Sequence, residues 1–125
     1  MKILVADDEE VIRELVRVTL AGDPALEVYQ ARDGEQAVQL AHEHAPDLLI
    51  LDVRMPKLDG FQVCAAVRRD ERTRNSTVLM LTALGQDTDR QRGIEAGAND
   101  YFIKPFSPTA LLSKVYGLMD ASQAV

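Results

Sequence analysis

Five polar residues in this sequence stand at the ends of short apolar runs. They are Asp7, Asp8, Asp52, Thr82 and Lys104. If the fold brings them together, the three carboxylates repel one another, and Mg²⁺, which prefers oxygen ligands, would hold them ionised. A metal ion, an ammonium and a hydroxyl around one carboxylate are also the groups that would hold a phosphoryl group on Asp52.

The run that precedes Asp52 is the most informative part of this pattern. Leu48-Leu49-Ile50-Leu51 lies between Pro46 and Pro56. A short run of branched apolar residues bounded by proline is typical of a central strand buried on both faces. Asp52 would then stand at the carboxyl end of that strand, where open α/β sheets bind ligands. Taken alone, an aspartate at such a point is equally typical of a residue that caps the following turn.

Short apolar runs alternate with segments of helical periodicity along the whole chain. The predicted strands are residues 3–6, 26–31, 48–52, 77–81 and 99–103. The predicted helices are residues 11–20, 34–45, 60–67, 87–97 and 108–118. This alternation predicts right-handed βαβ crossovers and a parallel sheet covered by helices on both faces. Because the carboxyl ends of parallel strands lie at one edge of a sheet, the five polar residues should converge there.

Local signals add details to this outline. Asp59 and Ser107 are suited to the N-caps of the third and fifth helices, and Gly97 is suited to the C-cap of the fourth. In the first helix, apolar residues stand at positions 11, 12, 15, 18 and 20. The segment from residue 68 to residue 75 reads as a charged loop.

Length and composition indicate one soluble domain. The 125 residues include 46% hydrophobic and 27% charged residues, and we place the domain at residues 1–120, with 121–125 as a tail or the start of a linker. The net charge of -6 disfavours nucleic acid or an anionic membrane as a direct partner. Cys64 is the single cysteine and reads as a small core residue, so we expect a reducing, cytoplasmic environment. No apolar run approaches the roughly 20 residues that span a bilayer.

The motifs at the strand ends resemble those of the receiver domains of bacterial two-component response regulators. The resemblance covers residues 2 to 119 and implies a (βα)5 flavodoxin-like fold with strand order 2-1-3-4-5. The residues that carry it are Asp7-Asp8, Leu51-Asp52-Val53-Arg54-Met55-Pro56-Lys57-Leu58-Asp59-Gly60, Leu81-Thr82-Ala83 and Gly97-Ala98-Asn99-Asp100-Tyr101-Phe102-Ile103-Lys104-Pro105-Phe106.

The resemblance implies a phosphorylation site and a metal site. Asp52 would accept a phosphoryl group from a phospho-histidine kinase or a phosphotransfer protein, and so become 4-aspartylphosphate in a phosphorelay. Asp8, Asp52 and the backbone carbonyl of Arg54 would bind Mg²⁺, with Asp7 acting through water. Such a domain is no enzyme in the usual sense, although it assists its own phosphoryl transfer and slow self-dephosphorylation.

The resemblance also implies a switch. Lys104 and Thr82 would contact the phosphoryl oxygens, and the side chain of Tyr101 would move on activation, together with the loop from residue 83 to residue 87. The family has a cis peptide bond at the position of Lys104-Pro105.

The output face is similar to that of receivers of the winged-helix transcription-factor class. Those receivers form active homodimers through the fourth helix, the fifth strand and the fifth helix. Ala110, where that class usually has glutamate, and the lack of basic residues over 117–120 depart from the pattern. The residues expected on this partner face are Arg90, Arg92, Glu95, Asp100 and Lys114.

Three other functions are compatible with parts of this pattern. A phosphatase of the dehalogenase type needs an aspartate two residues after its nucleophile, where this chain has Arg54. A flavodoxin-like cofactor site needs Gly, Ser and Thr donors after the first strand, whereas residues 7–10 are all acidic. A receiver that signals without phosphate would lack one of the five polar residues, and none is lacking here. A phospho-acceptor receiver is therefore the function that the sequence favours.

Overall fold

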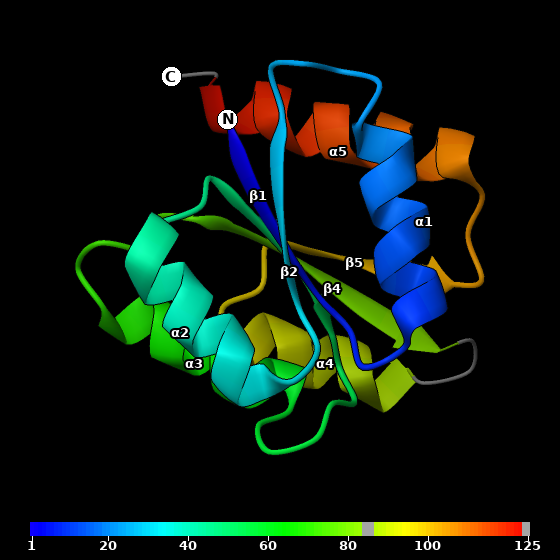
Figure 1. Cartoon of the computed structure of the whole chain (residues 1–125). Coiled ribbons are helices and arrows are strands. Elements are labelled where there is room, and N and C mark those ends of the chain that lie inside the picture. The colour runs from blue at the N-terminus through cyan, green and yellow to red at the C-terminus, as the bar shows by residue number, and fades with distance from the viewer. Residues whose placement is uncertain (84–86, 124–125) are drawn as a thin grey trace.

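The strands form one parallel sheet, as the sequence predicts (Figure 1). The computed structural model describes residues 1–83 and 87–123. Within this part of the chain the strand order is β2-β1-β3-β4-β5. The strands are β1 (Lys2–Ala6), β2 (Glu27–Ala31), β3 (Leu48–Asp52), β4 (Thr77–Ala83) and β5 (Asp100–Lys104).

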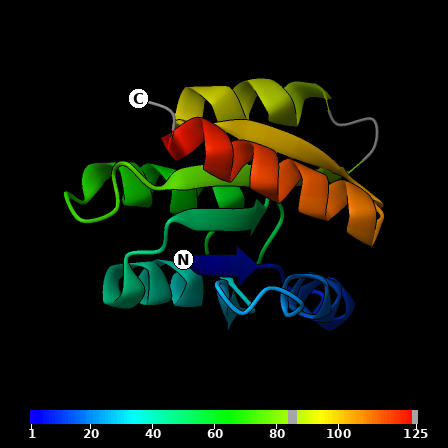
Figure 2. The ribbon, with the colours of Figure 1, turned by 90° about the horizontal axis from the view of Figure 1, so that it is seen from above.

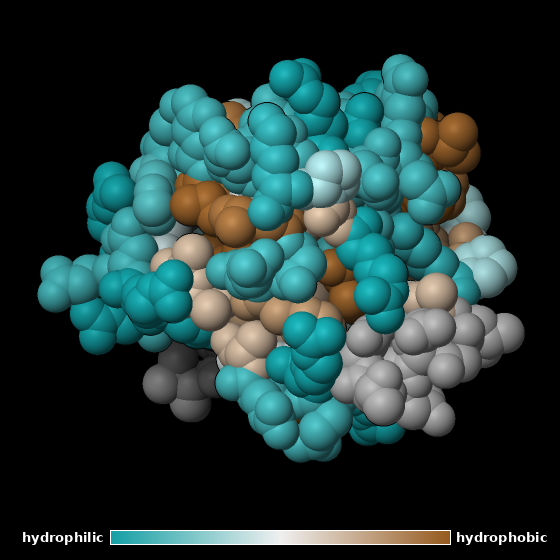
Figure 3. Space-filling model, turned by 90° about the horizontal axis from the view of Figure 1, so that it is seen from below, coloured by the Kyte–Doolittle hydropathy of each residue, from teal (hydrophilic) through white to brown (hydrophobic). Residues whose placement is uncertain are grey.

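Helices cover both faces of the sheet, which also confirms the prediction. Figures 1 and 2 show α1 and α5 on one face and α2, α3 and α4 on the other. None of the helices in the described ranges is long and apolar enough to cross a membrane. Hydrophilic side chains cover most of the face that carries α2, α3 and α4, with hydrophobic ones confined to small areas between them (Figure 3). The helices are α1 (Glu10–Leu20), α2 (Gly34–His44), α3 (Gly60–Arg69), α4 (Asp87–Ala96) and α5 (Pro108–Gln123).

Strand β3 is the centre of the fold. It pairs with β1 on one side and with β4 on the other, and all of its residues are buried. Because side chains alternate along a strand, Leu48 and Ile50 enter the core under α1 and α5, while Leu49 and Leu51 enter the core under α2 and α3. The apolar run is continuous because β3 contributes side chains to the cores on both faces of the sheet.

The predicted caps fix several helix ends. Asp59 accepts a hydrogen bond from the backbone N–H of Gln62 at 2.8 Å, and the Gln62 side chain accepts one from the backbone N–H of Asp59 at 3.0 Å. This reciprocal pair sets the start of α3 directly after the loop that follows Asp52. Ser107 accepts from the backbone N–H of Ala110 at 3.1 Å and starts α5. Gly97, with a φ of 102°, follows the end of α4.

The buried face of α1 differs from the apolar pattern of its sequence. Val16 and Leu20 are fully buried, whereas Val11 is 76% exposed and Val18 is 57% exposed. The helix places Ile12, Val16 and Leu20 on one face at intervals of four residues, and that face meets α5 and the sheet. Val11 and Val18 lie off this face, so counting apolar positions overstated the buried set.

Two boundaries differ from the prediction. Arg68 belongs to α3, which ends at Arg69, and is not part of the following loop. Its guanidinium donates to backbone carbonyls of neighbouring segments, and these bonds hold the last turn of the helix. Helix α5 continues to Gln123, three residues into the segment predicted as a tail.

Candidate functional site

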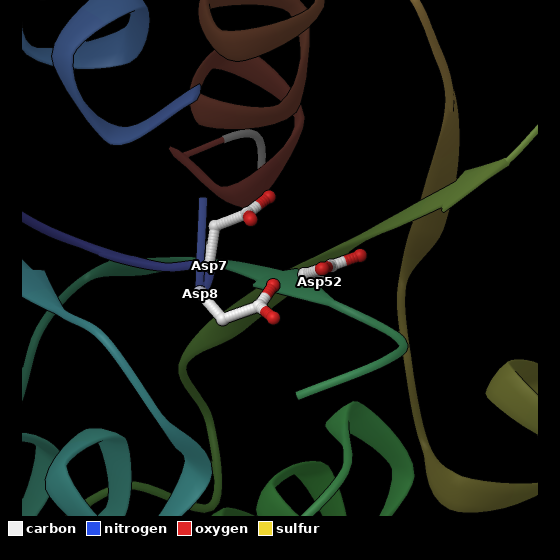
Figure 4. A group of neighbouring side chains, drawn as sticks. All are labelled: Asp7, Asp8 and Asp52. Atoms are coloured by element: carbon white, nitrogen blue, oxygen red, sulfur yellow. The ribbon is translucent and has the colours of Figure 1, made fainter. Parts of the chain in front are cut away.

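Three carboxylates lie together at the carboxyl edge of the sheet, as predicted. Asp7 and Asp8 follow β1, and Asp52 is the last residue of the adjacent strand β3 (Figure 4). The pairing of Ala6 with Leu51 brings these strand ends side by side. One carboxylate oxygen from each residue lies within 4.8 Å of the others. Asp7 and Asp52 are buried and Asp8 is exposed, so the cluster opens to solvent on the Asp8 side.

Lys104 supplies the positive charge of the site. Its Nζ lies 2.8 Å from Asp7 Oδ2 and 3.3 Å from Asp52 Oδ1. The residue ends β5, and the peptide bond between Lys104 and Pro105 is cis, as the resemblance implies. The contact with Asp7 is a close ion pair without the alignment of a hydrogen bond, so Oδ2 of Asp7 remains a buried acceptor without an aligned donor.

Burial shapes the protonation of these groups. Desolvation, followed by the charge of Asp7, raises the pKa of Asp52 to about 6, although Lys104 acts in the opposite direction. Desolvation also raises the pKa of Asp7. Burial by itself would lower the pKa of Lys104, but its close contacts with the carboxylates of Asp7 and Asp52 outweigh this, and its pKa is raised. The site therefore holds more buried negative charge than one lysine can neutralise.

These features fit a small divalent cation. The ligand atoms are all carboxylate oxygens, which suits Mg²⁺ better than the softer transition metals. Among the described residues, Asp7, Asp8 and Asp52 form the one group of three acidic, histidine or cysteine side chains close enough to share an ion. The exposed carboxylate of Asp8 leaves room on the solvent side for the water ligands that Mg²⁺ retains.

The backbone after Asp52 is held in place by its neighbours. The N–H of Val53 donates to the carbonyl of Leu81 at 3.0 Å, and the carbonyl of Val53 accepts from the N–H of Gly60 at 2.9 Å. A Cβ on Gly60 would lie 2.5 Å from the carbonyl oxygen of Asp52, so only glycine permits this approach. The course of the backbone that follows Asp52 is thus set by packing around Val53.

Thr82 lies one residue beyond the partner of Asp52 on the next strand. Asp52 pairs with Leu81 of β4, and Thr82 is the following residue. Its side chain is buried, and its hydroxyl makes one long contact of 3.5 Å with the carbonyl of Ala83. Among the described residues this is the one hydrogen bond of the Thr82 hydroxyl, and 3.5 Å is long for an O–H donor.

Comparison with known proteins identifies the family to which this arrangement belongs. Residues 3–116 match the family model described as the response regulator receiver domain. This chain belongs to the receiver family. Receivers are phosphorylation-activated switches of two-component systems, so the chain is a signalling domain and not a conventional enzyme.

Relatives and solved structures agree with this assignment. The receiver is 47% identical over 120 residues to RpaA of Synechocystis sp., named a DNA-binding dual master transcriptional regulator, with 94% of this chain and 48% of that protein covered. The chain thus spans about half the length of that curated relative. A response regulator from Chloroflexus aurantiacus has a TM-score of 0.88 and 39% identity, covering 95% of this chain and 97% of that one. The receiver domain of the sensor histidine kinase PA1611 from Pseudomonas aeruginosa, described with a magnesium ion coordinated in its active site cleft, has a TM-score of 0.86 and 30% identity over 95% of this chain and 97% of that one.

The expected switch residue of the receiver lies on β5, next to Thr82. Tyr101 pairs with Met80 of β4 and is half-buried. Its ring and Thr82 both line a cavity of about 130 Å³ between α4 and the sheet. The guanidinium of Arg90 lies over the ring, with Cζ 4.4 Å from the ring centroid. The loop residues 84–86, which the sequence expects to move with Tyr101, lie outside the described residues.

The residues expected on the partner face of the receiver divide into two groups. Lys114 of α5 and Asp100 of β5 form an ion pair at 2.9 Å, and Arg90 lies nearby over Tyr101. Arg92 is not with them, because its guanidinium lies 4.3 Å from the ring centroid of Phe61 on α3. Two positions along a helix differ by roughly 200° in direction, which separates Arg92 from Arg90. Glu95 accepts a hydrogen bond from the Gln91 side chain at 3.4 Å.

Two residues near the site were not singled out by the sequence. Glu9, the third residue of the acidic run 7–10, lies 3.5 Å from Nζ of Lys104 through its Oε1. Arg13 donates from Nη1 to the carbonyl of Asp7 at 2.7 Å and ties α1 to the loop that carries the acidic pair. The acidic run 7–10 directly before an amphipathic helix was a usable signal for Glu9. Arg13 offered no signal, because its partner is a backbone carbonyl.

Proposed function

We propose that this receiver accepts a phosphoryl group on Asp52 from a phospho-histidine of a kinase or phosphotransfer protein. The observation that carries the proposal is the carboxylate of Asp52 at the end of β3, with Nζ of Lys104 3.3 Å away and two further carboxylates beside it. An Asp52 oxygen would attack phosphorus while the bond from phosphorus to the histidine nitrogen breaks. The burial of Asp52 limits competing reactions with bulk water.

Mg²⁺ is the cofactor that this chemistry requires. Asp8, Asp52 and the backbone carbonyl of Arg54 would hold the ion, with Asp7 acting through water. When bound, the ion neutralises charge on the transferred phosphoryl group and on the carboxylates around it. The magnesium ion described in the active site cleft of the related P. aeruginosa receiver supports this choice of metal.

The chain's own side chains would complete the site. The ammonium of Lys104 would exchange part of its contact with Asp52 for a phosphoryl oxygen, and the hydroxyl of Thr82 would donate to another oxygen. Water that reaches the acyl phosphate would hydrolyse it slowly, so that the signal ends without a second protein. The cytoplasm, where phospho-histidine kinases present their phosphoryl groups, is the location we propose.

The output would be a change in the face formed by α4, β5 and α5. Thr82 moving toward the phosphoryl group would vacate space that Tyr101 can enter, and Arg90, Asp100 and Lys114 lie on the surface beside that ring. A homodimer through this face is the partner arrangement we propose. RpaA is a transcriptional regulator about twice as long as this chain, so we propose residues 1–120 as the receiver of a longer regulator, with 121–125 leading to a linker.

Labelling with acetyl phosphate tests the phospho-acceptor. Wild type should be labelled in the presence of Mg²⁺, and Asp52→Asn should not, because a carboxamide cannot form an acyl phosphate. Glu71→Gln is the matched control, because its carboxylate is 87% exposed and remote from the cluster. Label retained by Asp52→Asn at the wild-type rate would contradict the proposal. Circular dichroism of all three proteins checks that each is folded.

A further inference from the structure

Arg90 has an unusual environment for a surface arginine. Its side chain is exposed, and its guanidinium lies over the face of the Tyr101 ring. Asp100, the acidic residue next to Tyr101, is already engaged, because its Oδ2 accepts from Lys114 at 2.9 Å and its Oδ1 accepts from the N–H of Tyr101 at 2.8 Å. The guanidinium therefore lies over an aromatic ring in a place where no neighbouring described carboxylate is available to it.

A cavity lies beside Tyr101, between α4 and the sheet. Its volume is about 130 Å³, slightly less than the roughly 150 Å³ of a dry cavity that admits benzene, so the ring needs the additional space that a movement of Thr82 would vacate. Met80, Ile94 and Ala98 line the cavity together with Thr82 and Arg90. Gly93 of α4 also contributes to this space, because a Cβ there would meet nothing closer than 3.8 Å. The ring of Tyr101 forms one wall of the cavity and does not fill it.

These two observations describe a ring that lies beside a cavity and that stacks on Arg90 in its present position. We propose that the stack of Arg90 on Tyr101 restrains the ring outside the cavity and thereby sets the fraction of the receiver that is in the active arrangement before phosphorylation. The inference rests on the proposed function in one respect, namely that inward movement of Tyr101 accompanies activation. The restraint itself exists without any phosphoryl group and can be measured without one.

The same helix provides a matched control. Arg92 lies over the ring of Phe61 with its Cζ 4.3 Å from the centroid, nearly the distance of Arg90 from Tyr101. Phe61 is 8% exposed and belongs to the core under α2 and α3. Arg90→Met and Arg92→Met therefore remove the same charge and the same kind of contact from α4, but only the first change frees Tyr101.

The test measures where the Tyr101 ring lies in the protein without phosphoryl donor. Tyrosines are labelled with 3-fluorotyrosine, and ¹⁹F resonances of Tyr101 are assigned in a background where Tyr29 and Tyr116 are phenylalanine. Arg90→Met should raise the inward population about two- to fivefold, the factor expected for losing one cation–π contact at an exposed site. Arg90→Lys should give a smaller rise, and Arg92→Met should give none. An unchanged population in Arg90→Met, or an equal rise in Arg92→Met, would overturn the restraint.

A titration with beryllofluoride, which mimics the phosphoryl group, tests the link to activation. Arg90→Met should reach half-saturation at about two- to fivefold lower beryllofluoride than wild type, because less of the binding free energy is spent on releasing the ring. Equal half-saturation in the two proteins would overturn the claim that the restraint sets the resting active fraction. Failure of wild type to bind beryllofluoride at Asp52 would instead refute the proposed function, while the ¹⁹F comparison would still decide whether Arg90 restrains the ring.

Discussion

The two edges of the sheet treat polar groups in opposite ways. At the amino edge, polar groups are paired: Asn99 Oδ1 accepts from the N–H of Val78 at 2.7 Å and from Arg68 at 2.8 Å, and Asp47 accepts from the N–H of Lys2 at 2.9 Å. At the carboxyl edge, Asp7 and Asp52 are buried beside one another with pKa values raised by that burial. The paired groups at the amino edge stabilise the fold, whereas the buried carboxylates at the carboxyl edge destabilise it.

The two edges therefore have different roles in the domain. Paired donors and acceptors lower the free energy of the folded state and leave nothing for a ligand to satisfy. Crowded, under-neutralised carboxylates raise that free energy and create a demand for positive charge, which a cation or a change of protonation can meet. The free energy of binding at the carboxyl edge can therefore change the conformation of the rest of the domain. The hydrogen bonds at the amino edge keep the domain folded during this change.

The largest expected effect concerns Arg68 at the amino edge. Its guanidinium makes five hydrogen bonds, to the carbonyls of Gly97, Arg74 and Ser76 and to the side chain of Asn99. Arg68→Met should lower the free energy of unfolding by about 4 kcal/mol, because several acceptors lose a charged donor at once. Urea unfolding measures this change.

Arg69→Met is the control for this experiment. It removes the same charge from the exposed neighbouring position of the last turn of α3 and should change stability by less than about 0.5 kcal/mol. If both variants lost the same stability, the charge of the helix end would be responsible and the five bonds would not.

At the carboxyl edge, Asp52→Asn should raise the free energy of unfolding in the absence of Mg²⁺, in contrast to Arg68→Met. Because the pKa of Asp52 is raised from 3.8 to about 6 in the folded state, the folded protein binds a proton between these values that the unfolded chain has released. The stability linked to that proton is complete below about pH 3.8 and is lost as the pH rises through about 6. At neutral pH the ionised carboxylate costs on the order of 3 kcal/mol, and asparagine avoids that cost.

Urea unfolding at two pH values, with metal chelated, measures this gain. Asp52→Asn should be more stable than wild type by about 3 kcal/mol at pH 7.5 and by only about 1 kcal/mol at pH 4.5. Glu71→Gln, which removes an exposed carboxylate near the amino edge, should show no such dependence. A gain of equal size at both pH values would mean that the ionisation of Asp52 is not its cause.

The contrast between the edges also explains how far the sequence could be interpreted. The convergence of Asp7, Asp8, Asp52 and Lys104 was predictable, because short apolar runs, caps and the geometry of parallel strands are local signals with one consistent solution. The strand order came from the resemblance to receivers. The central position of β3 followed from the same reasoning. The residue roles at the site remain predictions that labelling must test.

What the sequence could not indicate depends on long side chains and on helix rotation. Arg68 looked like part of a charged loop, because its partners are backbone carbonyls that no residue pattern reveals. The exposure of Val11 and Val18 could not be predicted, because the rotation of α1 is decided by packing against α5. The stack of Arg92 on Phe61 could not be predicted either, since it depends on how α4 packs on α3.

The smallest expected effect is the response of the two edges to Mg²⁺. A cation that binds only the folded state stabilises it by about 1.4 kcal/mol when its concentration is ten times the dissociation constant. Wild type should therefore gain melting temperature as Mg²⁺ is added, because the ion relieves repulsion among the three carboxylates. Asp8→Ala should lose most of that gain, since it removes the exposed carboxylate of the cluster, whereas Glu71→Gln should keep it. If the melting temperature of wild type does not respond to Mg²⁺, Lys104 and protonation alone balance the negative charge of the three carboxylates.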